Sequence, residues 1–163
     1  MVISEMSDSE SRELLARLAS GRLACARDNQ PYITPIYFVY EANHLYCFAT
    51  VGQKIEWMRL NPRVCIQADE IRSHFEWKSV VVLGRYEELP YDPEHKKTYT
   101  HAITLLSNRS LWWQAAYATD QLRRHSGDPT PAVYCVHIEA ISGHRADPDA
   151  TEVRMEIAPP KGG

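Results

Sequence analysis

The sequence lacks the features that mark membrane-spanning, secreted or nucleic-acid-binding proteins. No apolar run approaches the ~18 residues that a membrane-spanning helix needs. The formal net charge of −3 argues against nucleic acid or an anionic membrane as the main partner. The start, MVISEMSDSESRELL, has neither the basic nor the apolar region of an export signal, so we expect a cytoplasmic protein.

Familiar motifs of metal and nucleotide sites are also missing. The seven histidines show no i, i+4 pair, and His101, His125 and His137 have no partner nearby in the sequence. The four cysteines lie singly in apolar runs without a C-x-x-C pair, which indicates small, buried, non-catalytic side chains in a reducing compartment. We therefore predict no metal site, and no G-x-G-x-x-G or Ser-His-Asp arrangement stands out either. The cysteines are Cys25, Cys47, Cys65 and Cys135.

The composition is that of one ordinary globular domain. The 163 residues suffice for a single core, and the 44% of hydrophobic and 24% of charged residues are typical values. Neither a repeat nor a linker is visible, so we predict one domain over residues 1–163. Ser7 and Glu10 form a capping-box pattern for a helix within residues 1–20 that ends at Gly21. Residues 144–163 are expected to form a loosely ordered tail.

Six apolar segments have the length and the residue types of β-strands. The first three follow one another at hairpin spacing, which favours an antiparallel meander. Pro35 interrupts the second segment, and Gly84 indicates a bulge in the fifth. Together with helices at 53–60, 92–106 and 111–122, this pattern predicts a mainly β fold, a six-stranded antiparallel barrel with flanking helices. The predicted strands are residues 22–27, 32–40, 45–49, 63–69, 77–89 and 132–141.

The stretch LYCFATVGQKIEWMRLNPRV, residues 45–64, predicts a strand, a tight turn and a short helix. Thr50-Val51-Gly52 interrupts the apolar run, and an Asn-Pro pair ends the helix. Lys54 falls in the first helical turn. Unpaired backbone N–H groups, a threonine hydroxyl and a lysine at one point suit a phosphate group. The alternative is an ordinary strand-to-helix turn with a solvated lysine.

These residues resemble the pyridoxamine 5′-phosphate oxidase-like FMN-binding split barrels. The similar segments are GRLA from Gly21, PYITPIYFVY, LYCFATVGQKIEWMRLNPRVCI and WKSVVVLGRYEEL. The most similar branch is that of the flavin-nucleotide-binding proteins, which include nitroimidazole-resistance proteins. The resemblance covers residues 21–89 well and the C-terminal half only loosely. It implies a split barrel with FMN as the cofactor.

Residue roles follow from the resemblance position by position. The turn after residue 49 matches the one that holds the FMN phosphate, and the strand at residues 34–39 matches the one whose backbone follows the isoalloxazine and the ribityl chain. Ser79 falls where the oxidases place a polar residue that faces the flavin. The implied cofactor-binding residues are Thr34, Pro35, Ile36, Tyr37, Thr50, Val51, Gly52, Gln53, Lys54 and Ser79.

The resemblance further implies a homodimer with FMN in the groove between two protomers. A flavin carries its own redox chemistry, so the protein need only bind, orient and tune it. We therefore expect an FMN-dependent oxidoreductase that acts on a small molecule, with NAD(P)H as a plausible electron donor. The alternatives are a non-enzymatic flavin carrier or sensor, or a protein that binds haem or a deazaflavin on the same fold.

The sequence departs from the true oxidases at three places. Thr34 stands where they have an arginine, and Gln53 stands where they have the second basic residue of a pair. The chain ends in APPKGG and lacks their arginine-containing C-terminal signature, which grips the phosphate of the vitamin. Pyridoxamine 5′-phosphate is therefore not the substrate that we expect.

The roles of four further side chains stay open at this stage. Trp112 and Trp113 could cover the flavin across the dimer, or be divided between core and interface. His74 and Trp77 could shape a substrate pocket, or be a surface histidine and a tryptophan at a strand end. Neither the substrate nor the electron donor follows from the sequence.

Overall fold

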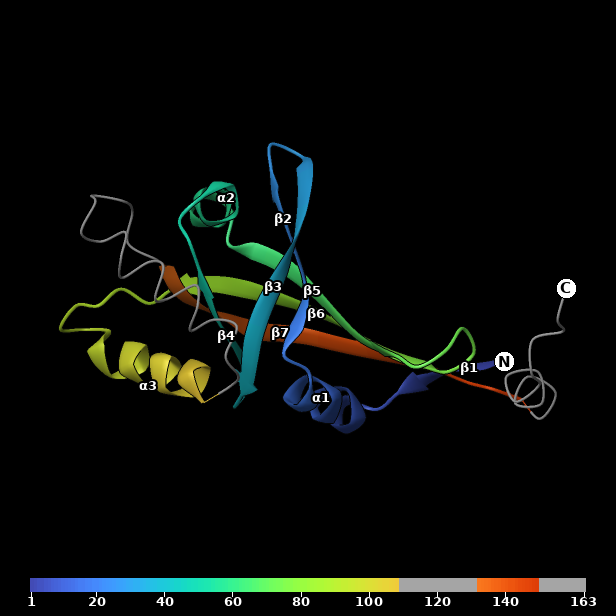
Figure 1. Cartoon of the computed structure of the whole chain (residues 1–163). Coiled ribbons are helices and arrows are strands. Elements are labelled where there is room, and N and C mark those ends of the chain that lie inside the picture. The colour runs from blue at the N-terminus through green and yellow to red at the C-terminus, as the bar shows by residue number, and fades with distance from the viewer. Residues whose placement is uncertain (109–131, 150–163) are drawn as a thin grey trace, which may run out of the picture.

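The computed structural model describes residues 1–108 and 132–149 (Figure 1). The predicted helix at 111–122 lies outside these residues. In chain order the elements are β1 (Val2–Met6), α1 (Asp8–Arg17), β2 (Ser20–Arg27), β3 (Gln30–Glu41), β4 (His44–Ala49), α2 (Gln53–Leu60), β5 (Arg63–Ile71), β6 (Trp77–Glu88), α3 (Lys96–Ser107) and β7 (Ala132–Asp147).

The six predicted strands, β2 to β7, close into an antiparallel ring. Neighbours around it are β7, β4, β3, β2, β5 and β6, and the pairing of β6 with β7 closes the circle. The hairpin turns β2–β3 and β3–β4 each contain two residues with positive φ, the conformation that suits tight hairpins: Asp28, Asn29, Ala42 and Asn43. The predicted β-barrel class is confirmed.

The barrel is split between β3 and β4. The two strands pair only from Glu41 and His44 up to Phe38 and Cys47. Beyond that point β3 remains paired with β2, while β4 remains paired with β7 as far as Ala49. The two strands separate there, as Figure 1 shows above the label of β3. The ends of β3 and β4 beyond Phe38 and Cys47 therefore do not pair with each other.

The chain also forms one strand that the sequence pattern does not predict. β1 pairs with the last residues of β7, from Met6 opposite Gly143 to Val2 opposite Asp147. Residues 144–147 are therefore strand, and the prediction of a loose tail from residue 144 is wrong for them. Arg145 fastens this end, because its guanidinium donates to Glu10 at 2.9 Å and to Ser4 at 3.2 Å.

Two short helices cover the barrel interior from opposite sides of the strands (Figure 1). The predicted capping box starts α1, in which Glu10 N–H donates to Ser7 Oγ and Ser7 N–H donates to the Glu10 carboxylate. α1 buries Leu14 and Leu15, and α2 buries Ile55 and Met58, all in the main core. In the described part of the chain, no helix is both long and apolar enough to cross a membrane.

Gly21 does not end α1, contrary to the prediction. The helix stops at Arg17, and Gly21 lies inside β2 opposite Ile36. A Cβ at this position would lie 2.6 Å from the carbonyl oxygen of Gln67 on β5. The close approach of two strands, not a helix cap, therefore requires this glycine.

The predicted bulge at Gly84 is confirmed. The β6–β7 register shifts between Leu83 and Gly84, and a Cβ on Gly84 would lie 2.4 Å from the carbonyl oxygen of His137. The bulge bends β6 where the ring closes. Alternate residues of β7 then point inward, such as Tyr134 and Val136, and outward toward α3, such as Cys135.

Candidate functional site

The α2 turn (residues 50–54) follows β4 at the split. Thr50 is exposed, Val51 and Gly52 are half-buried, and the first helical hydrogen bond runs from Glu56 N–H to the Gly52 carbonyl at 3.1 Å. Gly52 is the N-cap and offers no side-chain acceptor. Within residues 1–108 and 132–149, no side chain caps the first backbone N–H groups of α2, and a Cβ on Gly52 would meet nothing within 4 Å.

Lys54 lies in the first turn of α2 and is half-buried. Burial lowers the pKa of its ammonium group, and the thiols of Cys47 and Cys25 act on it in the opposite direction. No carboxylate in the described residues forms an ion pair with it. A cation at a helix N-terminus, partly desolvated and without a counter-charge, is unfavourable unless an anion binds there.

The position of α2 is fixed by contacts at its other end. The Arg59 guanidinium donates two hydrogen bonds of 2.7 Å to the Glu88 carboxylate, which also accepts one of 2.9 Å from the Tyr86 hydroxyl. These hydrogen bonds lower the pKa of Glu88, and Arg59 has the larger effect. Asn61 Nδ2 donates to the Ala26 carbonyl at 2.9 Å. Contacts of Arg59 and Asn61 therefore fix the C-terminal end of α2, and no residue of the α2 turn takes part in them.

The predicted residues of β3 face two directions. Ile36 is buried in the core, so only its backbone can contact a ligand, whereas Pro35 and Tyr37 are exposed and Thr34 is half-buried. A groove of about 250 Å³ runs along this part of β3. Its lining residues are Ser20, Gly21, Arg22, Pro35, Ile36, Tyr37 and Asp69.

Ser79 lies on β6 directly opposite Asp69 of this groove and is connected to the groove by polar contacts. Gln67 Nε2 donates to Ser79 Oγ at 3.1 Å, and Arg22 donates to Gln67 at 3.4 Å and to Asp69 at 3.5 Å. Sequence reasoning missed Arg22, Gln67 and Asp69. Their signal is weak, because they are alternate polar residues on β2 and β5 whose meeting depends on the β2–β5 register.

The other residues considered from the sequence lie elsewhere or are not described. His74 is exposed in the β5–β6 hairpin. Trp77 is half-buried at the start of β6 and lines a cavity of about 30 Å³ together with Arg72 and Glu76. Trp112 and Trp113 lie outside the described residues, as does His125.

Comparison with known proteins settles the family. The sequence profile of the family described as pyridoxamine 5′-phosphate oxidase matches residues 7–145. This chain belongs to that family. A protein of Rhizobium meliloti (strain 1021), itself uncharacterised, is 40% identical over 146 residues, which are 90% of this chain and 97% of the relative.

Solved structures support the same family and fold. A FAD-binding protein from Mesorhizobium loti is 42% identical, with a TM-score of 0.73, and the match covers 91% of this chain and 99% of that one. A structure described as that of a 5-nitroimidazole antibiotic resistance protein from Bacteroides thetaiotaomicron is 22% identical, with a TM-score of 0.58, over 90% of this chain and 92% of that one. The second likeness concerns the fold alone. The family predicted from the segments between residues 21 and 89 is thus confirmed, and the match extends into β7, as far as residue 145.

Proposed function

We propose that this chain binds a flavin nucleotide at the split between β3 and β4, with a phosphate group on the α2 turn. The observation that carries this proposal is Lys54, a half-buried cation without a carboxylate partner in the described residues, beside an uncapped helix N-terminus. A phosphate supplies acceptors for both the ammonium and the N–H groups. The FAD-binding relative from Mesorhizobium loti supports a flavin nucleotide as the ligand that carries this phosphate.

The other predicted residues fit the same ligand. The exposed Thr50 hydroxyl adds a donor beside Lys54, and Gly52 leaves open space where a phosphate would lie. The exposed stretch of β3 around Tyr37, with its groove, gives the isoalloxazine and the ribityl chain a surface to follow. Arg22 and Ser79 place polar groups along that path.

Both FMN and FAD carry the phosphate that the α2 turn would bind. The sequence resemblance favours FMN, whereas the relative at 42% identity is named for FAD. We propose a flavin nucleotide as the cofactor, with Lys54 on the phosphate next to the ribityl chain in either case. Haem and deazaflavin are the alternative cofactors on this fold.

We further propose that the protein is an oxidoreductase acting on a small molecule, with NAD(P)H as electron donor. A bound flavin supplies the electron transfer chemistry. The chain's own residues would hold the phosphate, fix the ring against β3 and keep water from one face of it. Pyridoxamine 5′-phosphate is not the proposed substrate, because the resemblance implies basic residues in the true oxidases where this chain has Thr34 and Gln53.

A homodimer is the proposed assembly. The outer face of β2, β5 and β6 carries a groove of about 410 Å³, lined mostly by small and apolar side chains such as Ala24, Cys65 and Leu83. Leu83 is 53% exposed, and Ile33 on β3 is 63% exposed. Apolar surface of this kind favours burial against a second copy. Light scattering of the flavin-loaded protein at micromolar concentration should give twice the mass of the chain, and a monomer mass would refute the shared site.

The cofactor itself is tested by the absorbance spectrum of the purified protein and by chromatography of what it releases on denaturation. We expect the two visible bands of an oxidised flavin and release of FMN or FAD. A Soret band or a deazaflavin spectrum would replace the proposed cofactor. If the flavin bands bleach on anaerobic addition of NADH or NADPH, the proposed electron donor is supported; a flavin that neither donor reduces favours a carrier.

A further inference from the structure

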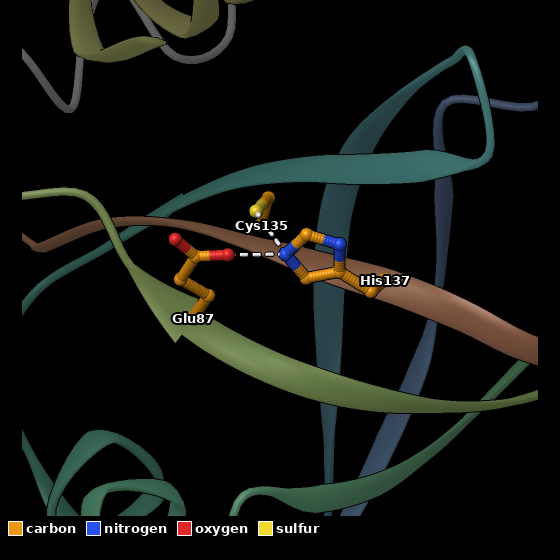
Figure 2. A group of neighbouring side chains, drawn as sticks. All are labelled: Glu87, Cys135 and His137. Carbon is orange, nitrogen blue, oxygen red and sulfur yellow. Dashed lines mark hydrogen bonds and ion pairs between the residues drawn. The ribbon is translucent and has the colours of Figure 1, made fainter. Parts of the chain in front are cut away.

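Three side chains with metal-ligating atoms meet on the outer face of the barrel near α3. Figure 2 shows Glu87 from β6 with Cys135 and His137 from β7, their end groups pointing toward one another. We call them the Glu–Cys–His cluster. Their carboxylate, thiol and imidazole atoms all lie within 4.8 Å of one another. His137 Nε2 is 3.7 Å from Cys135 Sγ and is in hydrogen-bond contact with Glu87 Oε2.

The strand register creates this cluster. Glu87 lies directly opposite Cys135 in the β6–β7 ladder, and His137 follows two residues later on the same face of β7. The bulge at Gly84 sets the β6–β7 register there. The cluster therefore occupies a fixed part of the barrel wall, not a loop.

We propose that the Glu–Cys–His cluster binds a divalent metal ion of the zinc class. Thiolate, imidazole and carboxylate are the three ligand types of zinc, and three protein ligands leave one position open for water or a substrate. Tetrahedral zinc, with bonds of roughly 2.0–2.3 Å, separates a sulfur from a nitrogen ligand by about 3.6 Å. The observed separation of 3.7 Å between Cys135 Sγ and His137 Nε2 already matches that edge.

The cluster is open on one side and supported on the other. The side chains of Glu87 and His137 are 46% and 42% exposed, so an ion can reach them from solvent, whereas Cys135 is buried under α3. Zinc that is held by a buried thiolate and two accessible ligands can exchange and react. This pattern is closer to a reactive or regulatory site than to a closed structural one.

His44 is the neighbouring imidazole on β4. It lies opposite His137 in the β4–β7 ladder, with ring centroids 4.4 Å apart. Its Nδ1 lies 2.7 Å from the Ala42 carbonyl, an acceptor, so Nδ1 carries the proton and Nε2 is free to bind a metal. His44 thus places a further imidazole beside the cluster.

Three features oppose metal binding. The ion must first replace the contact between His137 Nε2 and Glu87 Oε2. Burial, followed by the charge of Glu87, raises the pKa of the Cys135 thiol to about 12, so a metal ion must release that proton to solvent when it binds. Coordination to a dication deprotonates a thiol. Arg85 is the cross-strand neighbour of His137, but its guanidinium lies 3.5 Å from the Glu139 carboxylate.

Cobalt binding to the flavin-loaded full-length protein tests the proposal. Co²⁺ occupies zinc sites and gives a thiolate-to-cobalt charge-transfer band in the near ultraviolet, measured as a difference spectrum against the same sample without cobalt. We expect saturation at one cobalt per chain and displacement of the band by Zn²⁺. Glu87→Gln and His137→Gln should weaken binding about tenfold or more, since even partners behind the ligands change affinity by that amount.

A matched control separates the cluster from other imidazoles. His74→Gln changes an exposed histidine outside the cluster and should bind cobalt like the wild type. Cys135→Ser should lose the charge-transfer band. Absence of saturable binding in the wild type would overturn the proposal. So would a band that persists with unchanged affinity in His137→Gln and Glu87→Gln, which change side chains that are 42% and 46% exposed.

Discussion

The α2 turn consists of five consecutive residues, whereas the Glu–Cys–His cluster is assembled from two strands that lie about fifty residues apart in the chain. The geometry of the turn depends on local structure, namely the uncapped start of α2, a helix that is anchored through Arg59. The cluster depends on strand register, because a shift of one residue would move every outward side chain of β7 into the core. A local site can thus be predicted from a motif, while a register-dependent site appears only with the fold.

The largest expected effect is that of Gly84→Ala, which should damage the cluster and spare the turn. The new Cβ would lie 2.4 Å from the His137 carbonyl oxygen and 2.7 Å from Val136 Cγ1. Such overpacking lowers the free energy of unfolding by roughly 1–3 kcal/mol. Urea denaturation measures this loss, and cobalt affinity should fall while flavin affinity per folded chain stays unchanged.

Gly52→Ala is the matched control for that change. Its Cβ would meet nothing within 4 Å, and its φ of −171° suits any residue. The free energy of unfolding should stay within about 0.5 kcal/mol of the wild type. Flavin affinity should nevertheless fall, because the added methyl enters the space proposed for the phosphate. Equal losses of stability in both variants would remove the distinction between the two regions.

A smaller effect is expected at the anchor of α2. Arg59 holds the pKa of Glu88 below its usual value of about 4.3, so the stabilisation is complete at neutral pH and is lost as the pH falls through the lowered pKa. This partly exposed pair contributes on the order of 0.5–1 kcal/mol. The free energy of unfolding of the wild type should therefore fall more between about pH 7 and pH 3 than that of Glu88→Gln. Parallel pH profiles for the two proteins would contradict this role.

The smallest effect is that of Thr50→Val, which exchanges a hydroxyl for a methyl group of similar shape. One hydrogen bond contributes about 0.5–1.5 kcal/mol, so flavin affinity should fall by roughly two- to tenfold. Cobalt binding should not change. Flavin fluorescence titration measures the first quantity and the cobalt difference spectrum the second, and a variant that weakens both would show that the two regions are not independent.

Local patterns predict most of the fold. Apolar runs identify the six barrel strands, the Ser7–Glu10 pair identifies the start of α1, and Gly84 identifies the bulge. β1 escapes prediction because its side chains are mostly exposed, so backbone pairing with the polar end of β7 holds it in place instead of an apolar pattern. Gly21 is misread for a related reason, since its neighbour Gln67 comes from a strand far away in the chain.

The candidate sites likewise differ in how far local sequence patterns predict them. Residues 50–54 are predicted as a unit because turn, hydroxyl and cation follow each other in the sequence. Arg22, Gln67 and Asp69 are missed, because only the β2–β5 pairing connects them with Ser79. The sequence likewise predicts no metal site, because Cys135-x-His137 alone is not a recognised metal-binding spacing. Only the β6–β7 pairing brings Glu87 next to these two residues.

The most direct test of the central claim is the affinity of flavin-free wild type and Lys54→Ala for FMN, FAD and riboflavin, followed by flavin fluorescence. A hydrogen bond to a charged group is worth roughly 1.5–3 kcal/mol. FMN and FAD should therefore bind Lys54→Ala about ten- to a hundredfold more weakly. Riboflavin, which has no phosphate, should bind both proteins equally, and Lys97→Ala, which changes an exposed lysine on α3, should behave like the wild type. Equal FMN and FAD affinities for wild type and Lys54→Ala would contradict the placement of the phosphate on the α2 turn.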